Sequence, residues 1–523
     1  MSTEQSPPKL ADIALFRLPP PEERNRHHAD RTGGRSDGTR SVSPGDSDED
    51  WAPREAGEGG HRTNLRPPPE QRQPIVAESW KPVDWRLIVS LRRKASQEMT
   101  ERKRALEPGQ ELSEQDQRMM ARSVIRQVVR RHAETLSERG EALWSIDQEE
   151  AHVKALDNAI HGYGRLQPLF EIPEAENIEI HGCDSVSVQY GDGRREDHEP
   201  VADTDAELVE AIRFLGEMAS PSRPFDDAHP TMTLALGDRF RLHAIGFGLS
   251  YRPSVTIRQH TMTDVDLPDL VATGMLPEPV ARFLHAAVLA GKSIVVSGDQ
   301  GAGKTTLLRA LIAAIPANER FGTLETDYEL LTHLRPERRN ILALQAKTGL
   351  GERMDGRALG EFTVADLIPE ALRQNLSRIV VGEVRGAEAG AMFEAMTSGA
   401  GTMSTTHSHS AASTMDRLAS RVAQGGVLSI TEAYRQIAHH ISLFIHVSLV
   451  DEAWRGGVRR RQVAEIRQVT GGMEGDRPTT HLTYLAEPTA TEAAGFRPDA
   501  ALVHELARYA DGWPDPPSRE VRR

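Results

Sequence analysis

A glycine-rich turn between an apolar run and a helix-forming run carries the clearest chemistry in this sequence. Residues 293–297 are mostly β-branched and apolar, and the residues after them match G-x-x-x-x-G-K-[ST] at Gly298, Gly303, Lys304 and Thr305. Glycines let the backbone curl so that amide N–H groups point at phosphate oxygens, and the N-terminus of the following helix adds partial positive charge. The pattern predicts a Walker A loop that binds a nucleoside triphosphate; the alternative is a plain glycine-rich turn.

The residues of this loop have separate expected roles. Lys304 is long enough to reach the β- and γ-phosphates, and the Thr305 hydroxyl is a ligand for Mg²⁺. The loop therefore predicts ATP and Mg²⁺ as bound groups. The residues expected to contact the nucleotide are Gly298, Gly301, Gly303, Lys304, Thr305 and Thr306.

Two acidic stretches could supply the carboxylate that polarises the attacking water. Glu383 follows the apolar run 378–381 and a glycine, which predicts a position at the carboxyl edge of a sheet, where open α/β folds bind ligands. The alternative for Glu383 is an acid that only caps a strand end. The second stretch contains Glu325 and Asp327 and follows another predicted strand; it could hold Mg²⁺ through water or polarise water itself.

Histidines and arginines complete the candidate site. His407 follows the β-like run 402–406 and could contact the γ-phosphate. A zinc site built on His407 and His409 lacks a nearby third ligand, which argues against that metal. Four arginines precede the loop, and each is either a surface residue or a nucleotide contact. They are Arg239, Arg241, Arg252 and Arg258.

Composition limits the classes of protein. A chain of 523 residues predicts two or three domains with tails. The net charge of −14 argues against a general nucleic-acid-binding surface, which needs a basic face. The single cysteine, Cys183, excludes an intramolecular disulfide and fits a reducing cytoplasm. We expect neither a secretory signal nor a membrane span, so that any link to a membrane goes through a partner.

The N-terminal part of the chain divides into two regions. Residues 1–78 are rich in proline, glycine and charge, and we expect a disordered tail. An acidic run at residues 46–50 is followed by Trp51, which is either a short binding anchor or an aromatic residue without a role. Residues 79–162 repeat apolar side chains at helical spacing, with Ser113 as an expected helix cap.

Basic residues lie beside one of the apolar stripes in this helical region. Arg126, Arg130 and Arg131 either form a solvated helix face or a docking patch for an acidic partner.

The rest of the chain predicts an α+β domain at residues 163–260, a doubly wound α/β P-loop domain at 261–485, and a C-terminal helix with a tail at 486–523. The helix is expected at residues 500–509. Strands of the P-loop domain are expected at residues 293–297, 320–324, 341–345, 378–381, 402–406, 441–447, 461–469 and 480–484, with Gly471 and Gly472 as a turn between the last two.

The order of these motifs resembles the secretion ATPase superfamily that powers type II and type IV secretion systems and type IV pili. Within it, the chain is most similar to the CpaF/TadA-type ATPases of tight-adherence (Flp) pili. Residues 162–169 resemble the family's G-x-G-x-L-x-P-L motif at the start of its N-terminal domain, and residues 254–258 its S-x-T-I-R motif at the end. The resemblance runs from about residue 80 to residue 485.

The resemblance implies a RecA-like P-loop domain and assigns roles to single residues. Glu383 would be the Walker B glutamate, Glu325 would belong to the acidic box, and His407 to the histidine box. Arg241 and Arg258 match family arginines that reach the nucleotide from the N-terminal domain. Mg²⁺ would be held directly or through water by Thr305, Glu325, Asp327 and Glu383.

Two motifs depart from the family pattern. The acidic box usually reads Glu-Asp-Thr, but here the aspartate comes third, at Asp327. The histidine box usually continues His-Ala-Asn, whereas His407 is followed by a serine and His409.

The resemblance further implies a cytoplasmic, ring-forming ATPase, a homo-oligomer of six subunits. It would couple ATP hydrolysis to Flp pilus assembly or to type II/IV secretion, acting on an inner-membrane platform protein at the inner face of the membrane. The acidic net charge argues against direct binding of nucleic acid. The alternatives are a conjugative DNA-transfer or protein-secretion ATPase, and a nucleotide-binding scaffold that hydrolyses little.

Overall fold

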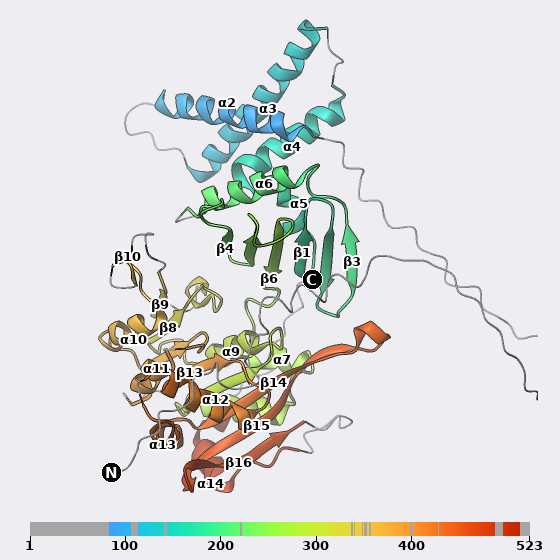
Figure 1. Ribbon diagram of the computed structural model, residues 1–523. Coiled ribbons are helices and arrows are strands. Elements are labelled where there is room, and N and C mark those ends of the chain that lie inside the picture. The colour runs from blue at the N-terminus through green and yellow to red at the C-terminus, as the bar shows by residue number, and fades with distance from the viewer. Residues whose placement is uncertain are drawn as a thin grey trace, which may run out of the picture. The chain divides into compact units, whose positions relative to one another are not determined.

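The computed structural model in Figure 1 describes most of the chain from residue 83 onward. The described residues are 83–105, 113–140, 144–219, 222–335, 338, 340–347, 349, 353–354, 357–386, 388–397, 401–426, 428–486 and 495–512. The predicted tail at 1–78 and the end of the predicted C-terminal tail lie outside them. Among the helices of the described part, none combines the length and apolar composition needed to cross a bilayer.

Three helices open the described chain and share one core. Their apolar stripes meet at the fully buried Leu91, Val124 and Leu156. The predicted cap Ser113 accepts the backbone N–H of Asp116 at 3.2 Å, so the helical spacing and this helix start are confirmed. The helices are α2 (Trp85–Arg104), α3 (Glu114–Glu138) and α4 (Ile146–His161).

The next part is a six-stranded antiparallel sheet in the order β3-β2-β1-β6-β5-β4. Helix α6 (Asp205–Met218) packs on it, because alternate strand residues such as Ile178 and Leu242 share a core with Leu208 of the helix. The short helices η3 (Gly164–Leu166) and α5 (Gln167–Phe170) add Leu166 and Leu169 to that core. The strands are β1 (Ala175–His181), β2 (Val186–Tyr190), β3 (Arg195–His198), β4 (Thr231–Leu236), β5 (Phe240–Ile245) and β6 (Ser254–Gln259).

An eight-stranded sheet follows in the order β16-β15-β14-β7-β13-β12-β8-β9. Its strands β14, β15 and β16 are labelled in Figure 1. The strands from β14 to β9 are parallel, and β15 and β16 continue the sheet as antiparallel strands. The strands are β7 (Ile294–Gly298), β8 (Phe321–Glu325), β9 (Ile341–Gln345), β12 (Arg378–Val381), β13 (Met403–Thr406), β14 (Leu443–Asp451), β15 (Arg459–Glu474) and β16 (Arg477–Leu485).

Helices cover both faces of this sheet. Alternating strand residues divide between two cores: Ile294 and Val296 pack on one face with α8 and α9, and Val295 packs on the other with α11 and α12. The helices around the sheet are α7 (Leu267–Ala272), α8 (Glu278–Leu289), α9 (Lys304–Ala313), α10 (Val364–Leu372), α11 (Glu388–Thr397), α12 (Ala411–Gln424), α13 (Ile430–His440) and α14 (Ala500–Leu506).

The strand order identifies the fold class. If β7, β8, β12, β13 and β14 are numbered 1 to 5, the parallel part reads 5-1-4-3-2, with β9 added at the edge next to β8. This is the RecA-like arrangement of a P-loop NTPase. The predicted fold class, a P-loop α/β part preceded by an α+β part and a helical part, is confirmed.

Three details of the predicted secondary structure are wrong. Gly471 and Gly472 form no turn between strands but lie inside β15, where the pairing with β16 shifts register between Val469 and Met473. Gly471 has φ 77°, a conformation that glycine adopts without the Cβ clash. The polar strand β3 was missed because it has no apolar alternation. The predicted C-terminal helix ends early, at Leu506, and continues as the 3₁₀-helix η6 (Ala507–Gly512).

Candidate nucleotide-binding site

The glycine-rich loop leaves the centre of the eight-stranded sheet. Strand β7 is buried along its whole length between β13 and β14, and it ends at Gly298. A Cβ atom on Gly298 would lie 2.3 Å from the carbonyl oxygen of Val447, so only glycine fits there. Gly303, with φ 97°, precedes the first residue of α9. The sequence therefore places a tight loop directly before a helix N-terminus, the arrangement that binds phosphate.

Lys304 is the first residue of α9, and it is almost buried, with 8% of its surface exposed. Its ammonium donates to the carbonyl oxygens of Gly298 at 3.1 Å and Asp299 at 3.0 Å, and it lies 3.2 Å from Nδ1 of His407. Burial lowers the pKa of this ammonium, and the negative charge of Glu383 opposes that effect. Lys304 thus lies inside the loop, held by the loop's own carbonyl groups.

His407 connects Lys304 to Glu383. Its Nδ1 faces the lysine ammonium, and its Nε2 lies 3.0 Å from Oε1 of Glu383. Because the ammonium only donates, Nδ1 is the acceptor and the ring proton belongs on Nε2. Burial and then the charge of Lys304 lower the pKa of His407. A neutral imidazole therefore bridges a cation and an anion.

Glu383 follows strand β12 and makes its closest contact with Arg385. Its Oε2 accepts a hydrogen bond from Nη2 of Arg385 at 2.6 Å, whereas Oε1 is buried and makes no hydrogen bond in spite of its nearness to His407. Burial alone would raise the pKa of this carboxyl, but the hydrogen bond from Arg385 and the nearby positive charges outweigh it and lower the pKa. Glu383 is therefore ionised at neutral pH.

Glu325, the last residue of β8, is more deeply buried than Glu383 and has a raised pKa. It is 3% exposed, and its Oε1 accepts the backbone N–H groups of Glu329 at 2.9 Å and Leu330 at 2.7 Å. Its Oε2 is buried without a hydrogen-bond partner. Burial raises the pKa of this carboxyl to about 7, against the opposing effect of the two backbone hydrogen bonds. Glu325 and Glu383 are therefore two carboxyl groups with pKa values moved in opposite directions.

A small cavity of about 30 Å³ is lined by both Glu325 and Glu383. Because β7, β13, β12 and β8 are adjacent and parallel, their carboxyl ends present Thr305, His407, Glu383 and Glu325 at one edge. A space of this size holds a water molecule or two. Among the described residues, no group of three or more histidine, cysteine or acidic side chains is placed to hold a metal ion. The cavity is lined by Arg241, Thr305, Glu325, Thr326, Asp327, Glu329, Leu330, Gly382, Glu383 and Arg385.

One of the four predicted arginines lines the cavity, and a second influences Lys304 through its charge. Arg241, on β5 of the six-stranded sheet, lines the cavity and forms ion pairs with Asp327 at 2.9 Å and with Glu329. Burial is the main cause of the lowered pKa of Lys304, and the charge of Arg258 contributes to it.

The other two arginines of the set have partners elsewhere. Arg252 pairs with Asp184 and Asp205, both at 2.7 Å, inside the six-stranded part. Arg239 lies over the ring of Phe240. Neither residue lines the cavity.

Other predicted residues occupy the edge of the site. The Thr405 hydroxyl donates to the carbonyl oxygen of Gly382 at 2.6 Å, which ties strand β13 to the loop that carries Glu383. His409 lies 3.2 Å from Asp299, on the exposed side of the glycine-rich loop. Thr306 is half-buried in the first turn of α9.

Three arginines at the site were missed from the sequence. Arg385 could have been found, since it lies two residues after Glu383 in the same motif. Arg309 is buried in α9 and donates to the carbonyl oxygens of Met262 at 2.8 Å and Glu329. Arg461 donates through Nε to the carbonyl oxygen of Gly301 at 2.7 Å. No local pattern marks Arg461, because strand pairing brings it to a loop far away in the sequence.

The chain is similar to known proteins of secretion and transfer systems. Residues 192–469 match the family described as type II/IV secretion system protein. A putative conjugal transfer protein of Mycobacterium tuberculosis is 30% identical over 369 residues, which cover 68% of this chain and 96% of that protein. The type IV secretion system protein PtlH of Bordetella pertussis is 35% identical over 185 residues, covering 35% of this chain and 52% of its own. The solved structure of the Legionella pneumophila ATPase DotB has a TM-score of 0.40 and 21% identity, covering 56% of this chain and 77% of that chain. From the family match and the mycobacterial relative, the chain belongs to the type II/IV secretion system protein family.

Proposed function

We propose that this chain is an ATPase that hydrolyses ATP at the edge formed by β7, β13, β12 and β8 and uses the energy to drive assembly of a tight-adherence (Flp) type pilus or type II/IV secretion. The observation that carries the proposal is the contact line from Lys304 through His407 to Glu383, which starts at the glycine-rich loop. A lysine for phosphate, an ionised carboxylate for water and a polar link between them are the groups that phosphoryl transfer to water needs.

The two carboxyl groups suit different tasks in this proposal. Glu383 has a lowered pKa and a buried Oε1 without a hydrogen bond, so it can accept a hydrogen bond from the attacking water. Glu325 has a pKa raised to about 7, so it is close to half protonated at neutral pH. Pairs of titratable groups whose environments separate their pKa values are typical of catalytic sites.

Lys304 would exchange its present partners for phosphate. Its ammonium is satisfied by the loop carbonyl groups of Gly298 and Asp299, so the loop is held in shape with the lysine inside it. Amide N–H groups of the loop and of the first turn of α9 would bind the remaining phosphate oxygens.

The residues around the cavity fit Mg²⁺ bound together with the nucleotide. Thr305 lines the cavity, and the buried Oε2 of Glu325 has no hydrogen-bond partner there. Mg²⁺ needs few protein ligands because it keeps water and phosphate oxygens, so the Thr305 hydroxyl would hold it, with Glu325, Asp327 or Glu383 acting directly or through water. The bound ion would supply positive charge against the phosphates.

In this proposal the chain has two domains, residues 163–260 and 261–485, which move relative to each other. Residues 79–162 form a helical region, and residues 486–523 form a C-terminal extension. Arg241 supports it, because this arginine of the first domain pairs with Asp327 and Glu329 of the second at the cavity. Arg241 and Arg258 would turn toward the phosphates when nucleotide is bound, and the domains would move with them. Six copies in a ring would pass that motion to a partner.

We place the chain with the CpaF/TadA-type ATPases, at the cytoplasmic face of the inner membrane with a platform protein as its partner. The second candidate is a conjugative transfer ATPase, which the similarity to the putative conjugal transfer protein of Mycobacterium tuberculosis favours. Co-purification from cells separates the two: a pilus platform protein supports the first candidate, and a DNA-transfer coupling protein or DNA supports the second.

The test of ATP use is the substitution Lys304→Ala, with Lys347→Ala as the matched control on an exposed lysine of the same domain. Loss of charge-assisted hydrogen bonds to phosphate costs about 1.5–3 kcal/mol, so we expect Lys304→Ala to weaken ATP binding at least about tenfold. Steady-state turnover should fall to background. Binding and turnover equal to those of the control would refute the proposal.

A further inference from the structure

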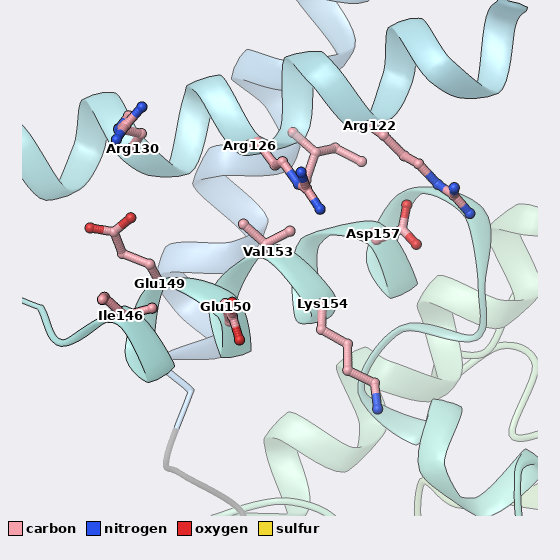
Figure 2. A pocket seen from close by; sticks show the side chains of 10 residues that line it. Arg122, Arg126, Arg130, Ile146, Glu149, Glu150, Val153, Lys154 and Asp157 are labelled. Atoms are coloured by element: carbon pink, nitrogen blue, oxygen red, sulfur yellow. The ribbon is translucent and has the colours of Figure 1, made fainter.

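A groove between helices α3 and α4 takes no part in the nucleotide site. It has a volume of about 640 Å³, and the buried Ile125 of α3 lines it. The half-buried Val153 of α4 lines it from the other side (Figure 2). Ile146, the first residue of α4, also lines the groove and is 77% exposed. Val153 and Ile146 therefore leave apolar surface open beside charged side chains, which is typical of surfaces that bind another segment of chain.

The α3 wall of this groove is basic. Arg122, Arg126 and Arg130 lie four residues apart, so they share one face of the helix, and all three are exposed (Figure 2). Within the part of the chain that the structure describes, none of the three guanidinium groups forms a hydrogen bond or an ion pair. Like charges at this spacing destabilise a helix, and an acidic segment bound along α3 would remove that repulsion.

The α4 wall of the groove is mainly acidic. Glu149, Glu150 and Asp157 line the groove from that side, with Lys154 as the one basic residue among the four charged residues that α4 contributes to the lining. The groove therefore fits a short segment with acidic residues toward α3, a large apolar side chain between the helices, and a basic residue toward α4.

We propose that residues 46–54 of this same chain bind the groove. This segment reads Asp-Ser-Asp-Glu-Asp-Trp-Ala-Pro-Arg, and it lies outside the described residues. Its four acids match the three arginines of α3. Trp51 follows them as the apolar side chain for the space between Ile125, Val153 and Ile146, and Arg54 is the basic residue for the α4 wall. Along the segment the order is acidic, apolar, basic, and across the groove from α3 to α4 the facing order is basic, apolar, acidic.

The connection is long enough for this contact. Trp51 lies 32 residues before Val83, where the description begins. A chain of that length spans at most about 105 Å, and α3 with its 25 residues is only about 37 Å long. Tethering gives effective concentrations in the millimolar range, so a segment with a dissociation constant of about 0.1 mM would occupy the groove about nine-tenths of the time.

Hydrogen–deuterium exchange of the full-length chain tests the proposal. One variant neutralises the acids of the segment (Asp46→Asn, Asp48→Asn, Glu49→Gln, Asp50→Asn), and its matched control neutralises four acids elsewhere in the tail (Glu22→Gln, Glu23→Gln, Asp30→Asn, Asp37→Asn). At the occupancy above, we expect peptides covering residues 118–131 and 146–157 to exchange up to about tenfold faster in the first variant and unchanged in the control. Trp51→Ala should act in the same direction.

A charge exchange makes the test specific to the groove. Arg126→Glu alone should speed exchange in the same peptides, and adding Asp48→Arg should restore the protection. Equal exchange in all variants would overturn the proposal. So would protection that depends on protein concentration but not on the segment, because a second copy would then be the occupant. An effect spread equally over peptides of the eight-stranded sheet would also overturn it.

Discussion

Glu176 and Arg461 form an ion pair that connects the six-stranded sheet to the glycine-rich loop. Glu176 is the extra residue of a β-bulge in β1, where Ala175 pairs with Tyr190 and Asn177 with Gln189. Its other oxygen accepts from Arg459 at 2.8 Å. Arg461 also donates to the carbonyl oxygen of Gly301 at 2.7 Å. A bulge re-aims a side chain, and here it directs a carboxylate at the arginine that holds the loop.

We therefore predict that Arg461→Lys slows turnover. Lysine keeps the charge, but its single ammonium cannot contact both the Glu176 carboxylate and the Gly301 carbonyl oxygen as the guanidinium does. A lost hydrogen bond to a charged group costs about 1.5–3 kcal/mol. We expect kcat to fall by about tenfold or more and Glu176→Gln to act in the same direction. The matched control is Arg460→Lys, the exposed neighbour on the same strand. If Arg460→Lys and Arg461→Lys have the same kcat, the connection has no role in turnover.

His407 offers a second prediction, since it contacts Lys304 and Glu383 at once. His407→Ala removes both contacts, and we expect kcat to fall about tenfold to a hundredfold. His407→Gln keeps one acceptor and one donor and should recover most of the loss. His409→Gln, two residues on and exposed, is the control. A kcat of His407→Gln as low as that of His407→Ala, or a loss in His409→Gln as large as that in His407→Ala, would contradict the bridging arrangement.

The stability of the chain should depend on pH through Glu325. Its pKa is raised from 4.5 to about 7 in the folded chain, so between those values the folded state binds more protons than the unfolded state. Stability from this group is present below about pH 4.5 and is lost as pH rises through about 7. Glu325→Gln keeps an acceptor without the charge, so above pH 8 it should exceed the wild type by up to about 3 kcal/mol.

Thermal unfolding of both proteins at pH 5.5 and pH 8.5 checks this prediction. The gap in melting temperature between Glu325→Gln and the wild type should widen in favour of the variant at the higher pH. Glu370→Gln, an exposed acid on α10, should show no such change. A gap that stays constant with pH would mean that Glu325 is not protonated in the folded chain at neutral pH.

Much of the candidate site could be predicted because its residues follow strands in the sequence. Gly298, Glu325, Glu383 and His407 each follow an apolar run, and parallel strands bring such positions to one edge. The pairing of Arg461 with Glu176 could not be predicted, because it depends on how β15 lies against another sheet. Arg252 was grouped with the site by sequence position, yet its pairing with Asp205 is decided by folding within its own sheet.

The sequence also did not reveal whether the glycine pair at Gly471 ends a strand or lies within one. Gly471 and its neighbour indicated a turn, because paired glycines usually mark one. In the structure β15 continues through them to Glu474 and shifts register instead. Glycine serves a turn and a bulge equally well, so the sequence does not distinguish the two.

The role of Glu383 in hydrolysis is tested most directly by measuring ATP turnover and ATP binding of Glu383→Gln side by side. The side chain keeps its size and loses the charge that would polarise water, so we predict turnover at least about a hundredfold lower with a dissociation constant for ATP within about threefold of the wild type. Turnover by Glu383→Gln within about twofold of the wild type would contradict it.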